Sequence, residues 1–474
     1  MHQSKLIVLL KSLSKVELNH FIEFTASPFF NKNSKVNQLL QLLVKAYPRF
    51  SPEQTDRKKV YQSLFNDKNI HEQKLRYLSS DLTSLLENFL AYSTFEKDTF
   101  SKQHFLLDAY RSRNISQFDK QLLQKEKKLF EDNPYQNGRH YRQSFLYQLD
   151  VYNHNPDKRE ISVEDNLREI IRDLDIYYII NKLQYSAELI NHTNLMAGEF
   201  EPLLLKEILT YLESHDHDNV PEISIYYQIL KTLLDSEDET HYTRLKEKLL
   251  LQINQLSASV INDMYVYARN YCVKKINLGR ADYLEELFEL YKTLIEKKII
   301  FRKGYLSQWD YKNIVATGLR LKAFDWVKNF VIDYQKTLIP QDRKNAFTYN
   351  LALYHFHIKQ YDKTLNLLKD VLFTDVYYHL DSKSLLMKTY YEMEESDPLY
   401  SLIEAFYAYL RRNKSISKYQ MKSYSNFLHY AKRLLKYRYR RKEFVEKLKP
   451  EIELKEAVAN KTWLLAKINE LLSV

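Results

Sequence analysis

The chain has 474 residues, of which 45% are hydrophobic, and it contains 39 Tyr but only 5 Gly and 10 Pro. Gly and Pro supply the turns that reverse strands, so this composition excludes a turn-rich all-β fold and favours helices joined by short polar loops. The formal net charge is +10. Residues 411–450 hold 14 Lys and Arg against 2 Glu, so the rest of the chain is close to neutral.

The rarer residue types exclude several kinds of chemistry. The five glycines are too widely separated to form a phosphate-binding loop, in which several backbone N–H groups must converge. The single cysteine, Cys272, excludes an internal disulfide and a multi-thiolate metal site, and its helical spacing indicates a small buried hydrophobe. We expect no cofactor, no metal and no enzymatic activity.

The first apolar run, residues 6–10, is too short for a signal-peptide core or a membrane span. Together with the free cysteine, it leads us to expect a cytoplasmic protein without a transmembrane segment.

Residues 1–97 are expected to form an N-terminal helical unit. Ser14 and Glu17 have the spacing of a capping box, and Ser51-Pro52 resembles a helix start. The apolar period predicts helices near residues 4–12, 15–26, 34–46, 53–65 and 71–93. An alternative for this unit is a winged-helix DNA-binding domain, in which residues 74–81 would be the recognition helix. The segment that follows continues as helix instead of forming a wing, which disfavours that alternative.

Residues 98–256 are predicted to form longer helices that link the N-terminal unit to the repeats. One helix is expected from about 162 to 190. Its apolar positions are Leu167, Ile170, Ile171, Leu174, Tyr178 and Leu183. The acidic and histidine residues at 213–218 form the densest set of potential metal ligands, but their alternating spacing favours a solvated loop.

Residues 257–412 show a repeating pattern of paired helices. The second helix of each pair is predicted to start at Tyr283, Phe324, Tyr361 and about Asp397, which are 41, 37 and 36 residues apart. A period in the thirties is typical of a helical solenoid, in which each hairpin buries its apolar face on its neighbours. The expected fold is therefore an all-α superhelix of helical hairpins with an N-terminal helical unit.

Residues 345–378 carry a resemblance to a known family. The segment Asn350-Leu351-Ala352, followed by Gln360 to Thr364 and by Leu368, Val371 and Leu372, resembles the tetratricopeptide-repeat superfamily. Thr364 stands where that family usually has alanine, and its closing proline is missing. The period extends over about 280–412. The resemblance implies a scaffold that binds partners.

By analogy with that family, the concave face of the repeats gives a candidate partner groove. Its residues would be Tyr349, Leu353, Phe356, Met387 and Tyr390. This face is aromatic, so it would suit a hydrophobic or helical peptide. The alternative is that a tightly wound superhelix packs these rings against its own turns.

Residues 413–474 are expected to form basic C-terminal helices. The candidate polyanion patch consists of Lys432, Arg433, Lys436, Arg440 and Arg441. Cations interleaved with tyrosines suit a nucleic-acid backbone with stacked bases, an acidic protein or an anionic membrane. The plainer interpretation is a solvated lysine-rich face.

From the sequence we therefore expect a non-catalytic helical-repeat scaffold that mediates protein–protein interaction. The alternative is a nucleic-acid-associated protein that uses the basic segment 411–449. No small-molecule substrate is evident.

Overall fold

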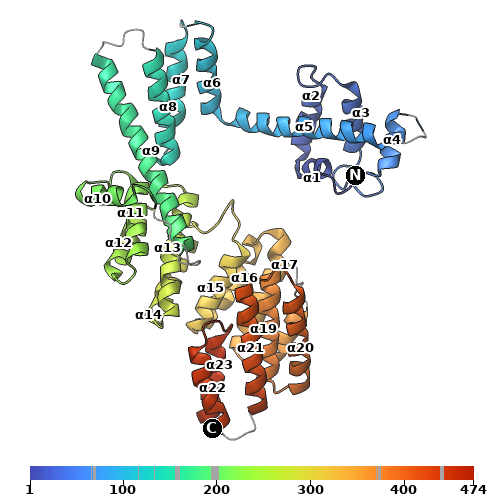
Figure 1. Ribbon diagram of the computed structural model, residues 1–474, viewed down its shortest axis with the longest axis vertical. Helices are drawn as coiled ribbons and strands as arrows, with labels where there is room; N and C mark the ends of the chain where they lie inside the picture. The colour runs from blue at the N-terminus through green and yellow to red at the C-terminus, as the bar shows by residue number, and fades with distance from the viewer. Residues whose placement is uncertain are drawn as a thin grey trace. The chain divides into compact units, whose positions relative to one another are not determined.

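The computed structural model describes all residues of the chain except 66, 68–70, 116, 133, 155–160, 194–201, 370, 372–374, 438–441 and 474. The described residues form 23 α-helices and one short 3₁₀ helix, and they contain no strand. The all-α class is thus confirmed. The chain divides into two compact units, residues 1–184 and 185–474 (Figure 1). The four segments expected from the sequence stay a prediction, and the boundary between the two units falls inside the expected segment 98–256.

The first unit contains α1 to α8 and most of α9. Their bounds are α1 (Lys5–Ser12), α2 (Lys15–Ala26), α3 (Ser34–Val44), α4 (Arg57–Phe65), α5 (Glu72–Lys97), α6 (Thr99–Arg111), α7 (Asp119–Glu131), α8 (Gly138–His154) and α9 (Ile161–Thr193).

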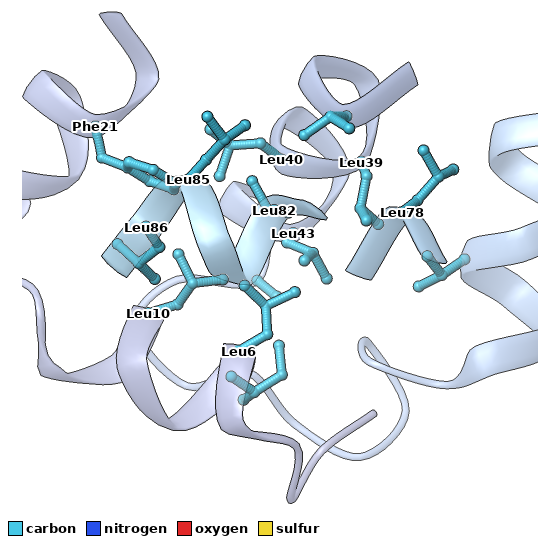
Figure 2. Close-up of a cluster of buried hydrophobic side chains, with 14 of the residues drawn as sticks. Leu6, Leu10, Phe21, Leu39, Leu40, Leu43, Leu78, Leu82, Leu85 and Leu86 are labelled. Carbon is cyan, nitrogen blue, oxygen red and sulfur yellow. The ribbon is translucent and has the colours of Figure 1, made fainter. Parts of the chain in front are cut away.

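The core of the N-terminal helices is built around α5, which contacts α1, α2 and α3. Leu82 and Leu86 of α5 are fully buried among leucines of α1 and α3, such as Leu6 and Leu40 (Figure 2). Apolar residues at every third or fourth position give each of these helices one apolar side, which packs into the core. Burying a leucine contributes roughly 1.5–3 kcal/mol, so this cluster dominates the stability of residues 1–97.

Local capping explains where the early helices start. The backbone N–H of Glu17 donates to Ser14 Oγ at 3.2 Å and that of Ser14 donates to Glu17 Oε2 at 2.8 Å, which confirms the capping box. The helix start predicted at Ser51-Pro52 is wrong. There the Ser51 carbonyl closes a turn by accepting from the Thr55 N–H at 3.0 Å. The helix α4 begins only at Arg57.

The second unit contains the C-terminal end of α9 and all later helices. Their bounds are α10 (Leu205–Ser214), α11 (Pro221–Leu234), α12 (Glu239–Leu251), α13 (Ala258–Asn277), α14 (Asp282–Glu296), α15 (Gln308–Arg320), α16 (Phe324–Asp333), α17 (Pro340–His357), α18 (Tyr361–Lys369), α19 (Val376–Glu392), α20 (Ser396–Arg412), α21 (Lys418–Tyr437), α22 (Lys442–Leu454) and α23 (Lys461–Ser473).

These helices pair in chain order. From α11 to α23 each helix contacts the next, and α15 also contacts α17, which in turn contacts α19 (Figure 1). The second helices of the predicted pairs, α14, α16, α18 and α20, begin at or within one residue of the predicted starts. The hairpin boundaries were therefore predictable from the sequence.

Candidate functional site

Two helix N-termini of the second unit bring aromatic side chains together. Ser307 Oγ accepts a hydrogen bond from the Asp310 N–H at 3.0 Å, which fixes the first turn of α15 and its Trp309. The Asp375 carboxylate accepts from the Tyr377 N–H at 2.8 Å and fixes the first turn of α19. Such caps satisfy backbone donors that a helix start leaves without partners, so they hold these residues in place.

Four rings make up what we call the aromatic cluster: Trp309, Tyr349, Tyr377 and Tyr378. The Trp309 ring centre lies 5.9 Å from that of Tyr377, at right angles, and 5.2 Å from that of Tyr378. Tyr349 packs edge-on against Tyr378 at 5.3 Å. Tyr349 and Tyr378 are buried, whereas Trp309 is 37% and Tyr377 is 48% exposed. The exposed Trp309 thus rests on the buried Tyr378, which in turn contacts Tyr349, and the exposed Tyr377 packs against Trp309.

A fixed charge lies beneath the aromatic cluster. The ammonium nitrogen of Lys312 lies 5.3 Å from the Trp309 ring centre and forms an ion pair with Asp381 of α19. Tyr424 of α21 donates its hydroxyl to the same carboxylate at 3.2 Å. Burial, reinforced by the charge of Asp381, raises the pKa of Tyr424 and keeps it a donor. This arrangement suits recognition, because exposed Trp and Tyr rings on a rigid support are typical anchors of protein interfaces.

The candidate partner groove differs from the prediction. Tyr349, Leu353 and Met387 are at most 8% exposed, so these three side chains are not accessible to a partner. Tyr349 and Leu353 belong to α17, which packs against α15, α18 and α19, and Met387 belongs to α19, which packs against α17, α18 and α20. Phe356 and Tyr390 keep part of their surface exposed, and their role in binding stays a prediction.

Lys388, the lysine beside Phe356, already has partners within the protein. Lys388 lies 5.4 Å from the ring centre of Phe356 and donates to Asn460 Oδ1 at 3.1 Å. Burial lowers the pKa of Lys388 to about 8, although Asp381 and Glu392 oppose the shift.

The candidate polyanion patch is partly neutralised by neighbouring helices. Lys432 pairs with Glu404 of α20 at 2.7 Å, and Arg433 makes two contacts with Glu451 of α22, at 2.5 and 3.1 Å. Lys436 is exposed. Arg440 and Arg441 lie outside the described residues. Of the described members, two are therefore engaged with carboxylates instead of being presented to a polyanion.

Cys272 is fully buried in α13, as the sequence predicted. Its sulfur lies 3.1 Å from the hydroxyl of Tyr242, which also donates to Glu286 at 3.0 Å. Burial raises the pKa of the thiol to about 12. A thiol that stays protonated is a poor nucleophile, so Cys272 is a packing residue.

The first unit contains a buried ionic cluster that the sequence analysis missed. Nδ1 of His104, in α6, lies 2.5 Å from Oδ2 of Asp150 in α8 and 3.6 Å from Oε1 of Glu126 in α7. Arg111 contacts the other oxygen of Asp150 at 3.1 Å. These carboxylates, Asp150 first, raise the pKa of His104 to about 10, so the imidazole is a cation at neutral pH.

The three residues also have ligand types that metals use, and among the described residues they form the one such group. Ligand atoms around a tetrahedral zinc are about 3.3 Å apart, because each bond is about 2.0–2.1 Å long. The 2.5 Å between His104 Nδ1 and Asp150 is a hydrogen-bond distance instead. The geometry therefore favours an ion network that connects α6, α7 and α8. A sequence signal existed, since Glu126 stands midway between the buried Leu122 and Phe130 on the apolar face of α7.

The segment 213–218 does not gather into a metal site in the part of the chain that the structure describes. Asp218 instead accepts from Lys248 at 2.5 Å and from Ser224 at 2.8 Å, and the His215 ring stacks on Tyr211. This agrees with the predicted polar loop.

None of the helices formed by the described residues combines the length and apolar character needed to cross a bilayer. No protein-family model matches the chain, and neither a curated protein nor a solved structure proves similar to it. The resemblance to tetratricopeptide repeats thus stays a prediction made from its residues.

Proposed function

We propose that this protein is a non-catalytic helical-repeat scaffold that binds protein partners in the cytoplasm through the aromatic cluster of its second unit. The observation that carries the proposal is the exposure of Trp309 and Tyr377, which pack against each other while Trp309 rests on the buried Tyr378. The fully buried free Cys272 is compatible with a reducing compartment.

The pairing of successive helices supports a scaffold role. In repeat proteins each hairpin contacts mainly its neighbours, and the stacked first helices form an extended binding surface. The contacts of α15 with α17 and of α17 with α19 follow this pattern. The exposed rings Trp309 and Tyr377 come from α15 and α19, so a partner would contact two hairpins at once.

The chemistry of the aromatic cluster favours an apolar partner segment. Trp309 and Tyr377 offer two apolar ring faces, and the cation of Lys312 is already paired with Asp381. A hydrophobic or helical peptide would bury these rings without leaving a buried charge unpaired. Removing one interface Trp or Tyr anchor typically costs 2 kcal/mol or more, which is about a thirtyfold loss of affinity.

The proposal is tested by affinity capture from native lysate with the intact chain and a Trp309→Ala/Tyr377→Ala variant. We expect protein partners retained by the intact chain to be lost from the variant, with and without nuclease. A Tyr419→Ala variant is the control, because Tyr419 is 67% exposed on α21 and far along the chain from the cluster.

Two results would contradict the proposal. One is retention of the same partners by the double variant. The other is capture that disappears with nuclease treatment and with Lys432→Glu/Lys436→Glu, which would favour the nucleic-acid alternative.

A further inference from the structure

The long helix α9 exposes a row of apolar side chains that we call the α9 stripe. Its members are Leu167, Ile171, Leu174 and Tyr178, which are 39%, 59%, 44% and 43% exposed. Their spacing of four, three and four residues places them on one side of the helix, over about 16 Å. All four lie in the first unit.

The α9 stripe is unusual because, at the same level of the helix, the covered side of α9 is the more polar one. Asn166 and Asp173 are 9% and 0% exposed there, and the buried apolar residues Ile180 and Leu183 follow farther along the helix. An amphipathic helix normally turns its apolar side inward, so an apolar row left exposed marks a contact surface. The neighbouring helix α7 shows the ordinary pattern, since its exposed positions are almost all polar: Lys120, Gln121, Gln124, Lys125, Lys127 and Lys128.

The α9 stripe is complementary to itself. A spacing of four, three and four is that of a coiled-coil seam, and it reads the same in both chain directions. A twofold axis between residues 172 and 173 would therefore place Leu167 opposite Tyr178 of the second copy. It would also place Ile171 opposite Leu174. Each end of the α9 stripe is then covered by the opposite end of the stripe of the second copy.

The charges beside the α9 stripe favour the antiparallel arrangement. Arg168 and Asp175 are exposed, carry opposite charges and lie seven residues apart on the same edge of the stripe. In the antiparallel pair, Arg168 of each copy comes close to Asp175 of the other. A parallel pair would instead bring Asp175 close to Ile170, which offers no charge.

The same charges disfavour a membrane as the occupant. Residues 164–175 contain five acidic side chains and two arginines, so the segment is net negative. Helices that lie on anionic membranes are basic on their polar face.

From the self-complementary spacing and the flanking charges we propose that two copies of this chain associate through antiparallel α9 helices. Four layers of side chains are a small interface, so the dimer is expected to dissociate on dilution. The inference does not depend on the proposed partner binding, which concerns other residues in the second unit.

Sedimentation equilibrium over a concentration series tests the proposal. The intact chain is expected to approach twice its 57.2 kDa mass at high concentration and to return to 57.2 kDa on dilution. Ile171→Glu is expected to raise the dissociation constant at least about tenfold, because it buries a charge in the seam. Val8→Glu is the matched control: Val8 is also β-branched and is also 59% exposed, but on α1.

A charge exchange tests the antiparallel geometry. Arg168→Glu alone and Asp175→Lys alone are each expected to weaken association by about threefold to tenfold, since each change puts like charges together. The variant with both changes is expected to recover most of the loss.

A 57.2 kDa mass at every concentration would overturn the proposal, as would a dimer that Ile171→Glu leaves unchanged. A dimer that the exchanged pair does not restore would overturn the antiparallel arrangement. Binding of the intact chain to anionic phosphatidylserine vesicles, lost in Ile171→Glu without any dimer, would assign the α9 stripe to a membrane and also overturn the proposal. Far-UV circular dichroism checks that each variant is folded.

Discussion

Lys312 of α15 forms an ion pair with Asp381 of α19, although 69 residues separate them in the chain. The pair lies under the aromatic cluster and connects the first helices of two different hairpins. Both side chains are largely buried, at 20% and 25% exposure. It therefore helps to hold the proposed binding surface in place.

Asp381→Ala is expected to destabilise the second unit by about 2 kcal/mol, because the Lys312 ammonium and the Tyr424 hydroxyl lose their acceptor. All three tryptophans, Trp309, Trp326 and Trp463, lie in this unit. Urea unfolding followed by tryptophan fluorescence therefore reports on it. Asp381→Asn, which keeps an acceptor for Tyr424, is expected to cost less. An Asp381→Ala variant as stable as the original chain would show that the pair contributes nothing.

Gly318 allows α15 to approach its neighbours. A Cβ at this position would lie 2.6 Å from Val327 Cγ2 and 3.1 Å from a ring carbon of Phe288. Gly318→Ala is therefore expected to destabilise the second unit by about 1–3 kcal/mol, despite the better helix propensity of alanine. Adding Val327→Ala should cost less in the Gly318→Ala background than in the original chain. Equal costs, measured by urea unfolding, would contradict the close approach.

The boundaries of the helices within residues 257–412 were predictable because they depend on neighbouring residues. A period of apolar side chains and short polar turns placed the starts of α14 and α18 to within one residue. The packing of helices against one another, and the exposure of their side chains, were not predictable in the same way. The period of α9 predicted the helix, but it does not show that the apolar positions of the α9 stripe are left exposed. The sequence left open whether the groove residues face a partner or pack against neighbouring turns, and the three buried ones lie between neighbouring helices.

The partners of charged side chains could not be predicted from the sequence either. Lys432 and Arg433 form part of a basic run, yet their carboxylate partners lie 28 and 18 residues away. His104 meets acids from two other helices. Such contacts follow from helix packing, which the order of residues alone does not give.

His104 is expected to titrate near pH 10, well above the ordinary histidine value of 6.5. Because the folded-state pKa is raised, its stabilisation of the first unit is full below about pH 6.5 and is lost as the pH rises through 10. Histidine-selective NMR measures the titration, and His104→Gln assigns the signal. A midpoint near 6.5 would contradict the ion network.

The basic segment is expected to bind polyanions only weakly, since two of its cations are paired. Neutralising their partners with Glu404→Gln/Glu451→Gln should delay elution from a heparin column. The charge-matched control is Glu53→Gln/Glu207→Gln, which changes two exposed glutamates elsewhere. Equal shifts in both variants would mean that only net charge matters. Strong, steeply salt-dependent retention of the original chain would favour the nucleic-acid alternative.

Amide hydrogen exchange on the intact chain, with and without a captured partner, tests the central claim most directly. Protein binding through the aromatic cluster predicts slower exchange in the first turns of α15 and α19, which carry Trp309 and Tyr377. The slowing should be absent with the Trp309→Ala/Tyr377→Ala variant. Slowing confined to residues 418–449, with both first turns unchanged, would contradict the proposed scaffold surface.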